Sequence, residues 1–476
     1  MTTIIRADAP DALAGAAGRG SALFLGLVCL VASIGGLLFG FDTAVISGTF
    51  GFIEAQYGLN KLEVGWFGSS ALVGCLLGAA VAGTLTDRFG RKPVLIAAAA
   101  FFFLCALGCA IAPSFTAIVA ARIVGGLGVG MASVLAPMYI SEFSPPRLRG
   151  RLVALYQLSI VLGILAAYFS NWLLLGFAQG HADAFGSAGW LHRTLVAEVW
   201  RGMFGVGMVP AAVFFLLLFV VPESPRWLLK VGKDALALQI LARVSGVDTA
   251  RKEVGEIQEA LLHDGASVVE LFKPGLRMAL MVALALSIFG QMTGVNIVVY
   301  YGPTILEAAG FTLGNAMQYQ VALGVINFIF TLIAIWKIDS WGRRPLLIWG
   351  LAVVTLAMAG TAILLLKGAP ALWIVLLLCI YMACEALSIC AVIWVLTAEI
   401  FPNRIRGRAM SITIFANWAT NALTAFFFPW YVERFGMHAG FFSFAAVCFV
   451  ATLFFWKFVP ETKGRSLEEI ERHWLA

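Results

Sequence analysis

The sequence predicts an all-α integral membrane protein in which twelve transmembrane helices form two six-helix halves. Three observations lead to this fold class: an apolar composition, a series of long apolar stretches, and junction motifs that occur twice. Of the 476 residues, 61% are hydrophobic and 12% are charged, whereas soluble domains carry roughly 45–50% apolar and about 25% charged residues. So few polar side chains cannot cover a water-facing surface. The composition therefore excludes a soluble enzyme and a nucleic-acid-binding chain.

Apolar stretches long enough to cross a bilayer recur along the whole chain. A transmembrane helix needs about 20 apolar residues, and these stretches lack the alternation of a barrel strand. They lie at about 23–48, 64–86, 93–112, 116–140, 152–175, 200–221, 276–304, 317–338, 346–366, 371–398, 409–432 and 438–456. Because only helices and closed barrels pair every backbone group inside lipid, we expect twelve spanning helices.

The polar segments divide the chain. We expect a cytoplasmic N-terminal tail at 1–22, a six-helix domain at 23–221, an intracellular helical linker at 222–275, a second six-helix domain at 276–458 and a cytoplasmic C-terminal tail at 459–476. The linker contains KVGKDALALQILARV and RKEVGEIQEALLHD. Both stretches have the periodicity of amphipathic helices.

The distribution of Lys and Arg predicts the orientation, because these residues are enriched in cytoplasmic connections. Among the 32 Lys and Arg residues, Arg122 lies inside a span, and nearly all others lie in the even-numbered connections and the tails. The exceptions, in odd-numbered connections, are Lys61, Arg193, Arg201, Lys367 and Arg434. Both termini are therefore expected on the cytoplasmic side of the plasma (inner) membrane. The net charge of +6 belongs to that face.

Three junction motifs occur once in each half, in the same order. GTLTDRFGRK (83–92) pairs with IWKIDSWGRR (335–344), EFSPPRLRGR (142–151) with EIFPNRIRGR (399–408), and PESPRW (222–227) with PETKGR (460–465). Parallel repeats of this kind are related by an axis along the membrane normal, and their substrate site lies between them at mid-depth. The sequence thus indicates a duplicated six-helix transporter.

These motifs resemble those of the sugar porter family of the major facilitator superfamily, with the closest likeness to bacterial proton-coupled xylose symporters. The resemblance covers residues from about 23 to 471 and implies the major facilitator fold. It also implies that charged residues at the cytoplasmic ends of the helices form ion pairs that lock the outward-facing state. These gating charges are Asp87, Arg91, Glu142, Arg149, Glu223, Arg226, Asp339, Arg343, Glu399 and Arg406. An ordinary positively charged rim is the alternative.

Three charged residues lie well inside spans: Asp42, Arg122 and Glu385. Each costs about 2.5–3.5 kcal/mol at a helix centre on insertion scales, so each requires an explanation. An Asp beside an Arg stays ionised, and protonation removes their attraction. The resemblance implies the same role, since proton-coupled sugar porters have Asp at this place in span 1 and uniporters have Asn. We therefore assign proton coupling to Asp42 and Arg122, with a static structural pair as the alternative.

A sugar site needs amides that pair with hydroxyl groups and aromatic rings that cover the C–H surface. The spans supply such residues, and the resemblance extends the set. The candidates are Phe39, Gln157, Gln291, Asn296, Tyr301, Asn327, Glu385, Trp394, Asn417 and Trp418. Glu385 lies one residue out of register with a substrate-binding Glu of facilitative glucose transporters. A position between helices is the alternative for Glu385, and interhelical hydrogen bonding is the alternative for each amide.

Departures from the family pattern leave the identity of the sugar open. Gly290 replaces the first Gln of a Gln-Gln pair in span 7, which we expect to enlarge the cavity. Ile164 replaces a second Gln of span 5. Ile389, Cys390 and Ala391 replace a Trp-Gly-Pro sequence in span 10. Without the Gly-Pro pair, span 10 lacks the usual signal for a helix break.

The sequence therefore predicts a secondary active transporter that couples protons to a monosaccharide, a pentose or hexose such as xylose or glucose, by alternating access. A proton-coupled inositol-type polyol symporter is the first alternative, and a non-transporting sugar sensor is the second. No motif supports an enzyme or an ATP-driven pump. The expected partners are the sugar, the proton and the lipid bilayer, without nucleic acid, cofactor or metal. We expect a monomer.

Overall fold

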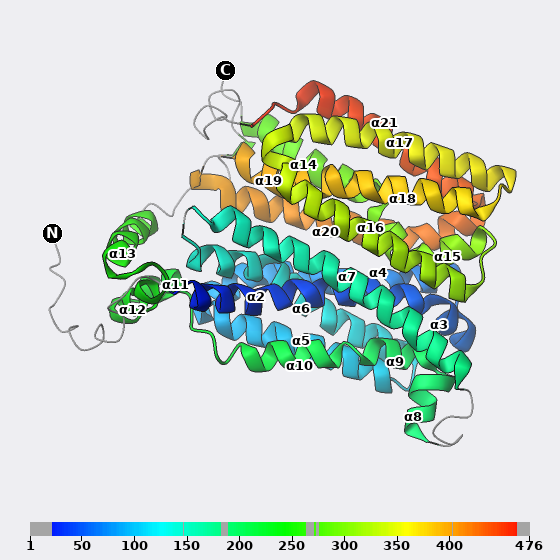
Figure 1. Cartoon of the computed structure of the whole chain (residues 1–476), viewed down its shortest axis with the longest axis horizontal. Helices are drawn as coiled ribbons and strands as arrows, with labels where there is room; N and C mark the ends of the chain where they lie inside the picture. Colours follow the sequence, from blue (N-terminus) through cyan, green and yellow to red (C-terminus); the bar gives the residue numbers. More distant parts are fainter. Residues whose placement is uncertain are drawn as a thin grey trace.

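The computed structural model describes residues 21–145, 147–181, 189–262, 271–272, 276–401 and 403–463. Within these ranges the chain is helical and contains no strand. Figure 1 shows two stacked layers, α2–α10 below and α14–α21 above, with α11–α13 projecting at one end. We call that end the linker face, and the opposite end, where α3 and α8 lie, the distal face. The fold prediction is confirmed.

The N-terminal half contains the first six spans. Its helices are α2 (Ala22–Val45), α3 (Phe50–Tyr57), α4 (Lys61–Phe89), α5 (Arg91–Ile111), α6 (Phe115–Phe143), α7 (Arg149–Gly180), α8 (Trp190–His192), α9 (Val199–Gly205) and α10 (Met208–Leu217). Short turns of 3₁₀-helix (Ile46–Gly48) and π-helix (Arg193–Ala197) join some of them. Local sequence fixes several starts. Asn60 and Glu63 form a capping box at α4, and Ser114 caps α6.

The segment between the halves forms α11 (Pro225–Lys230), α12 (Asp234–Ser245) and α13 (Val247–Leu262). Helices α12 and α13 coincide with the two amphipathic stretches. They pack beside the N-terminal half: the amide of Ser21 donates to the carbonyl of Arg243 at 2.8 Å, and the Arg243 guanidinium lies 4.3 Å from the centre of the Phe24 ring. The linker helices therefore extend the N-terminal half at the linker face.

The C-terminal half contains α14 (Leu276–Met292), α15 (Val295–Ala308), α16 (Leu313–Trp341), α17 (Arg343–Lys367), α18 (Ala371–Leu387), α19 (Ile389–Ile400), α20 (Asn403–Phe435) and α21 (Met437–Phe458). Two spans are broken near their middle. Span 7 consists of α14 and α15, separated at Gly294, whose φ of 90° favours glycine. Span 10 consists of α18 and α19, separated at Ser388.

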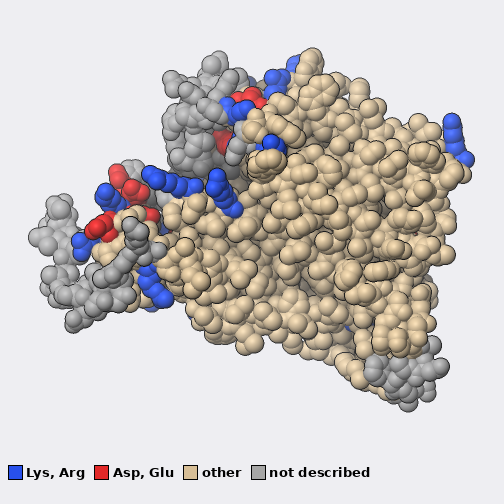
Figure 2. Space-filling model, viewed as in Figure 1, with Lys and Arg blue, Asp and Glu red and all other residues tan. Residues whose placement is uncertain are grey.

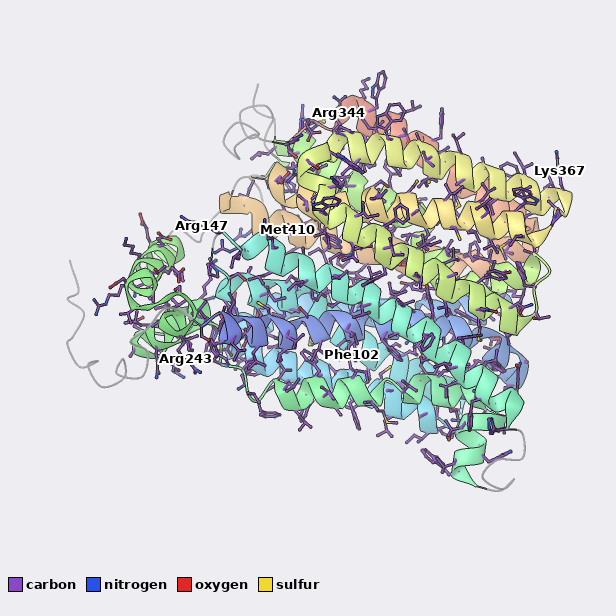
Figure 3. All side chains as sticks on the ribbon, in the orientation of Figure 1. Phe102, Arg147, Arg243, Arg344, Lys367 and Met410 are labelled. Atoms are coloured by element: carbon purple, nitrogen blue, oxygen red, sulfur yellow. The ribbon has the colours of Figure 1, made fainter. Side chains whose placement is uncertain are left out.

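Eleven of the twelve expected spans are long and apolar enough to cross a membrane. The twelfth is α20, a helix of 33 residues that packs along α4 of the other half. Figure 2 shows charged side chains gathered at the linker face and a nearly uncharged surface over the spanning helices. In Figure 3, Arg147 and Arg243 lie toward the linker face and Lys367 lies at the distal end. This charge-poor belt is what lipid contact requires.

Span 10 breaks even though it lacks the Gly-Pro pair of the family pattern. The backbone of Ser388 has φ −100° and ψ −104°, which ends α18. A Cβ atom on Gly350 of α17 would lie 2.2 Å from the Cβ of Ser388, so only glycine leaves room for this serine. The break therefore depends on packing against α17 rather than on a local helix-breaking residue.

Glycines bring α4 and α6 into backbone contact. Added Cβ atoms on Gly74 and Gly126 would lie 2.2 Å from the Ile123 carbonyl oxygen and 2.0 Å from the Ala71 carbonyl oxygen. Gly78 and Gly130 make similar close approaches. Small residues allow such contact between helices in lipid.

We expect Gly126→Ala to destabilise the protein, because its Cβ would push α4 away. Overpacking of this kind costs about 1–3 kcal/mol. The melting temperature of the purified protein in detergent should fall by several degrees. Gly83→Ala on α4 is the matched control, since no atom lies within 4 Å of its added Cβ. Equal melting temperatures for the two variants would contradict the packing argument.

Candidate transport site

Asp42 and Arg122 form a buried ion pair between α2 and α6. Nη1 of Arg122 donates to Oδ1 of Asp42 at 3.1 Å and to the Asp42 carbonyl oxygen at 3.0 Å. The side chains of Arg122 and Asp42 are 2% and 13% exposed. From α5, the Cys105 thiol lies 3.5 Å from the same Oδ1. Because both charges are removed from water, each depends on the other.

The second carboxylate oxygen of Asp42 has no hydrogen-bond partner among the described protein groups. Asp42 also lines a small cavity of about 10 Å³, roughly the space that one water molecule needs. The cavity is lined by Leu38, Phe41, Asp42, Val45, Phe102, Ala106, Phe204 and Gly207; Phe102 marks its place in Figure 3. One oxygen thus pairs with Arg122, while the other has no partner in the described part of the chain.

Two of the predicted sugar-binding residues meet at the boundary between the halves, and others flank a helix break or keep accessible surface. The rings of Phe39 on α2 and Trp418 on α20 lie 5.5 Å apart, one from each half. Gln291 and Asn296 flank the break of span 7, and the amide nitrogen of Asn296 donates to Oε1 of Gln291. Gln157, Gln291 and Asn296 are partly exposed, and Trp394 is 40% exposed. These four side chains therefore keep surface that a solute can reach.

Asn417, next to Trp418 on α20, is buried, and its Nδ2 has no partner among the described protein groups. An unpaired buried amide is costly, so a ligand hydroxyl would satisfy it. Asn421 lies one helical turn further along α20 and donates to the Tyr300 hydroxyl at 3.1 Å. Sequence reasoning missed Asn421, although its four-residue spacing from Asn417 places both on one helix face.

Other candidates have different surroundings. The Tyr301 hydroxyl donates to the Ala425 carbonyl at 2.9 Å, and its ring stacks on Phe50 at 4.4 Å. Tyr301 therefore packs against the other half, and its hydroxyl is already engaged. Asn327 accepts from Thr331 at 3.5 Å. Glu385 is fully buried, and the side chains that face its carboxyl group are Thr293, Tyr381 and Cys390. This is the interhelical position left open as the alternative for Glu385.

Gly290 does not enlarge the cavity as the sequence suggested. It is buried, and an added Cβ would lie 3.1 Å from Cδ1 of Ile393 and 3.6 Å from Cδ1 of Ile389. The two isoleucines, of which Ile389 belongs to the altered part of span 10, fill the space beside the glycine. The departures in spans 7 and 10 thus compensate each other sterically.

The halves are closed toward the distal face. Besides the Phe50–Tyr301 stack, the Tyr168 hydroxyl of α7 donates to the Val299 carbonyl of α15 at 3.2 Å. A Cβ on Gly65 of α4 would lie 1.9 Å from the Phe426 carbonyl oxygen of α20. All these contacts lie in the distal parts of their helices. We call them the distal seam.

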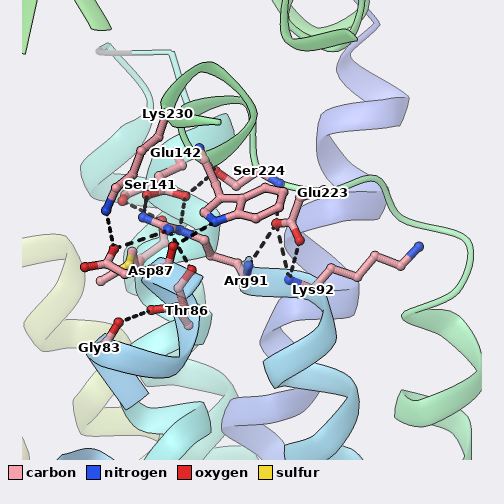
Figure 4. A network of polar contacts seen from close by, with 12 residues as sticks. Gly83, Thr86, Asp87, Arg91, Lys92, Ser141, Glu142, Glu223, Ser224 and Lys230 are labelled. Carbon is pink, nitrogen blue, oxygen red and sulfur yellow. Dashed lines mark hydrogen bonds and ion pairs between the residues drawn. The ribbon is translucent and has the colours of Figure 1, made fainter. Parts of the chain in front are cut away.

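At the linker face, a polar network joins the helices of the N-terminal half (Figure 4). Arg91 donates to both oxygens of Glu142, at 3.1 and 2.9 Å, and Glu142 also accepts from the Ser224 hydroxyl. Glu223 accepts from the amides of Arg91 and Lys92 at 2.9 and 3.1 Å and so caps α5. Burial raises the pKa of Glu223, although these hydrogen bonds oppose the rise.

The C-terminal half repeats this network. Arg343 donates to Glu399 at 3.0 Å, Thr462 donates to Glu399 at 2.6 Å, and Glu461 accepts from the amides of Arg343 and Arg344. In both halves a glycine with positive φ precedes the arginine, Gly90 at 97° and Gly342 at 89°. The two junctions therefore share the same arrangement of arginine, carboxylates and glycine, as the sequence duplication suggests.

The remaining gating charges lie around these networks. Asp87 is exposed and pairs with Lys230 at 2.9 Å. Arg149 is exposed and faces Glu253 of α13, and Arg226 is partly exposed on α11. The side chains of Asp339 and Arg406 lie outside the described residues. The ion pairs of Arg91 with Glu142 and of Arg343 with Glu399 each join helices of one half, so a lock between halves stays a prediction for another conformation.

Two similar six-helix halves, closed on one side, with polar and aromatic side chains between them, define a transporter of the major facilitator type. The chain belongs to the family described as "Sugar (and other) transporter", whose model matches residues 28–474. It is a multi-pass membrane protein and a transporter rather than an enzyme.

Similar proteins with assigned functions cover nearly the whole chain. The arabinose-proton symporter of Bacillus subtilis is 40% identical over 95% of both chains. The D-xylose-proton symporter of Escherichia coli is 37% identical, over 94% of this chain and 95% of that one. The major myo-inositol transporter of Bacillus subtilis is 36% identical over 95% of both chains.

Solved structures of the Escherichia coli xylose transporter share the fold. The partially occluded inward-open conformation gives a TM-score of 0.82 at 35% identity and covers 94% of this chain and all of that one. The form bound to 6-bromo-6-deoxy-D-glucose gives 0.76 at 36% identity, over 95% of this chain and 99% of that one. The higher score belongs to the inward-open form.

Proposed function

We propose that this protein is a proton-coupled monosaccharide symporter that works by alternating access, with a pentose or hexose such as xylose or arabinose as its substrate. The observation that carries the proposal is the buried Asp42–Arg122 pair, in which one carboxylate oxygen is bound and the other is free to take a proton. The proton-coupled relatives named above support the same assignment.

The Asp42–Arg122 ion pair would couple binding of a proton to movement of α2. With Asp42 ionised, Arg122 holds α2 against α6 by a charge-assisted hydrogen bond. Protonation of Asp42 removes that attraction and leaves α2 free to shift. Phe39 lies on the same helix, one turn before Asp42, and contacts Trp418 of the other half. A shift of α2 on protonation of Asp42 would therefore also move Phe39, which is part of the proposed sugar site.

The sugar would bind between the halves. The amides of Gln157, Gln291, Asn296 and Asn417 are suited to its hydroxyl groups, and Phe39, Trp394 and Trp418 are suited to its C–H faces. Tyr301, Asn327 and Glu385 act through the surrounding packing rather than by direct contact in this conformation. The linker face is cytoplasmic, together with both termini, and the closed distal seam and the similarity to a partially occluded inward-open structure support an inward-facing conformation. The functional unit is a monomer.

The linker-face arginines and carboxylates are proposed to stabilise the outward-facing state. We expect Glu142→Gln and Arg343→Ala to shift the population toward the inward-facing form and to change the transport rate, because each removes a charge from the ion pairs proposed to join the halves in the outward-facing state. Spin-label distances across the linker face measure the population. An unchanged population and rate in both variants would refute this role.

Trp394 provides a test of the sugar site. We expect Trp394→Ala to weaken sugar binding at least about tenfold, which corresponds to about 1.4 kcal/mol, since Trp is among the residues that most often act as binding hot spots. Isothermal titration calorimetry with xylose measures this effect. Trp349→Ala on α17 is the matched control, because Trp349 is 75% exposed on the outside of the helix layer. Equal affinities would place Trp394 outside the site.

Uptake into proteoliposomes tests the proposed function as a whole. Labelled xylose, arabinose, glucose, galactose and myo-inositol are compared with and without an imposed pH gradient. We expect accumulation of a pentose or hexose above equilibrium only with the gradient. Preferred accumulation of myo-inositol would favour the polyol alternative. Binding without any uptake would favour a sensor.

A further inference from the structure

A second carboxyl group is buried in the membrane-spanning region, in the half of the molecule opposite Asp42. Glu385 of α18 has no exposed surface. Its Oε2 lies 3.9 Å from the Cys390 thiol, and its Oε1 has no hydrogen-bond partner among the described protein groups. A carboxylate buried without a cation is strongly disfavoured, whereas the neutral acid is far less costly to bury.

No cation faces Glu385 among the described residues. The titratable groups around it are Tyr381 and Cys384 of α18, Cys390 of α19 and Cys448 of α21, and the connection between α14 and α15 presents Thr293. The helices α16 and α17 also pack on α18. Their charged residues lie near the helix ends: Lys337, Asp339, Arg343 and Arg344 toward the linker face, and Lys367 at the distal face.

Glu385 lies where the two broken spans meet. It precedes the break of span 10 at Ser388 by three residues and faces Thr293, in the break of span 7. Tyr381, one turn earlier on α18, donates to the Thr293 carbonyl at 3.2 Å. The Ser388 hydroxyl is also buried without a partner in the described part of the chain. The same two breaks position Gln291, Asn296 and Trp394, so a charge at Glu385 would disturb the sugar site.

We propose that Glu385 is a second proton-binding site of this transporter. The carboxyl group is neutral while spans 7 and 10 pack as they do here. When the breaks open and water reaches it, it releases its proton to that water as the carboxylate, and it takes a proton back from the same side of the membrane, so it carries no proton across. The reverse step takes a proton from water and breaks no other covalent bond. The proposal rests on the proposed transport function but not on the role of Asp42.

Sugar exchange at equal pH on both sides separates the two sites. Asp42→Asn should still exchange sugar, and its exchange rate should fall with rising pH by up to about tenfold per pH unit as Glu385 loses its proton. Asp42→Asn combined with Glu385→Gln should exchange at a rate independent of pH. The same pH dependence in both variants would overturn the proposal, as would restoration of exchange by sodium ions at alkaline pH. Failure of Asp42→Asn to lose uphill transport would contradict only the Asp42 assignment.

Infrared spectroscopy gives an independent readout. The wild-type protein in its inward-facing form should show the C=O stretch of a protonated carboxyl group in an apolar site. This band should persist in Asp42→Asn and in Glu307→Gln, a control at an exposed carboxylate of α15. It should disappear in Glu385→Gln. If that variant does not fold, Glu385→Asp should shift the band, and an unshifted band would overturn the proposal.

Discussion

Asp42→Asn should abolish accumulation of sugar against its gradient and leave sugar exchange intact. Asparagine keeps the size of the side chain and can still accept a hydrogen bond from Arg122, but it cannot take up and release a proton. A gradient of one pH unit is worth about 1.4 kcal/mol, which supports about tenfold accumulation for one proton per sugar. In the variant, the internal and external concentrations should become equal.

The measurement is uptake of labelled sugar into proteoliposomes with an inwardly directed proton gradient, followed by counterflow without a gradient. Counterflow shows that the variant folds and moves sugar. Cys105→Ala is an informative companion, because it removes the thiol 3.5 Å from Oδ1 and keeps the carboxylate. It should retain accumulation. Undiminished accumulation in Asp42→Asn would remove this residue from the coupling mechanism.

A large side chain at Gly65 should trap the transporter with its distal seam open. Even a Cβ atom at this position would lie 1.9 Å from the Phe426 carbonyl oxygen, which belongs to the backbone of the opposite half. Because a backbone atom cannot move aside as a side chain does, the halves cannot close here around a leucine. We expect Gly65→Leu to lower transport and exchange by more than about tenfold, since each 1.4 kcal/mol of clash is a factor of ten.

Spin labels on the distal ends of α4 and α17 would report the trapped state as a longer distance between the halves. Gly83→Leu on the same helix is the control, since no atom lies within 4 Å of its added Cβ. It should leave both distance and rate near the wild-type values. A Gly65→Leu protein that transports normally would show that the seam closes by a different contact from the one described here.

The two broken spans show where sequence reasoning reached its limit. The Gly-Pro signal for a break is absent from span 10, yet α18 ends at Ser388 because Gly350 on another helix leaves room for the serine. Likewise, the glycine at position 290 predicted a larger sugar cavity, but Ile389 and Ile393 of span 10 fill the space beside it. Each outcome depends on a residue about forty to one hundred positions away in the sequence. Local patterns do not encode such pairs.

The twelve spans, the duplication and the two residues proposed for proton coupling can all be recognised in the amino-acid sequence. These features follow from free energies that each residue carries alone: apolar side chains prefer lipid, and a buried charge needs a partner. Which side chains contact one another depends on the tertiary structure. It joined Arg91 to Glu142 within one half, placed Tyr301 in the distal seam and enclosed Glu385 between two helix breaks. Hydrophobicity and charge belong to single residues, whereas burial and contacts arise only when helices pack together.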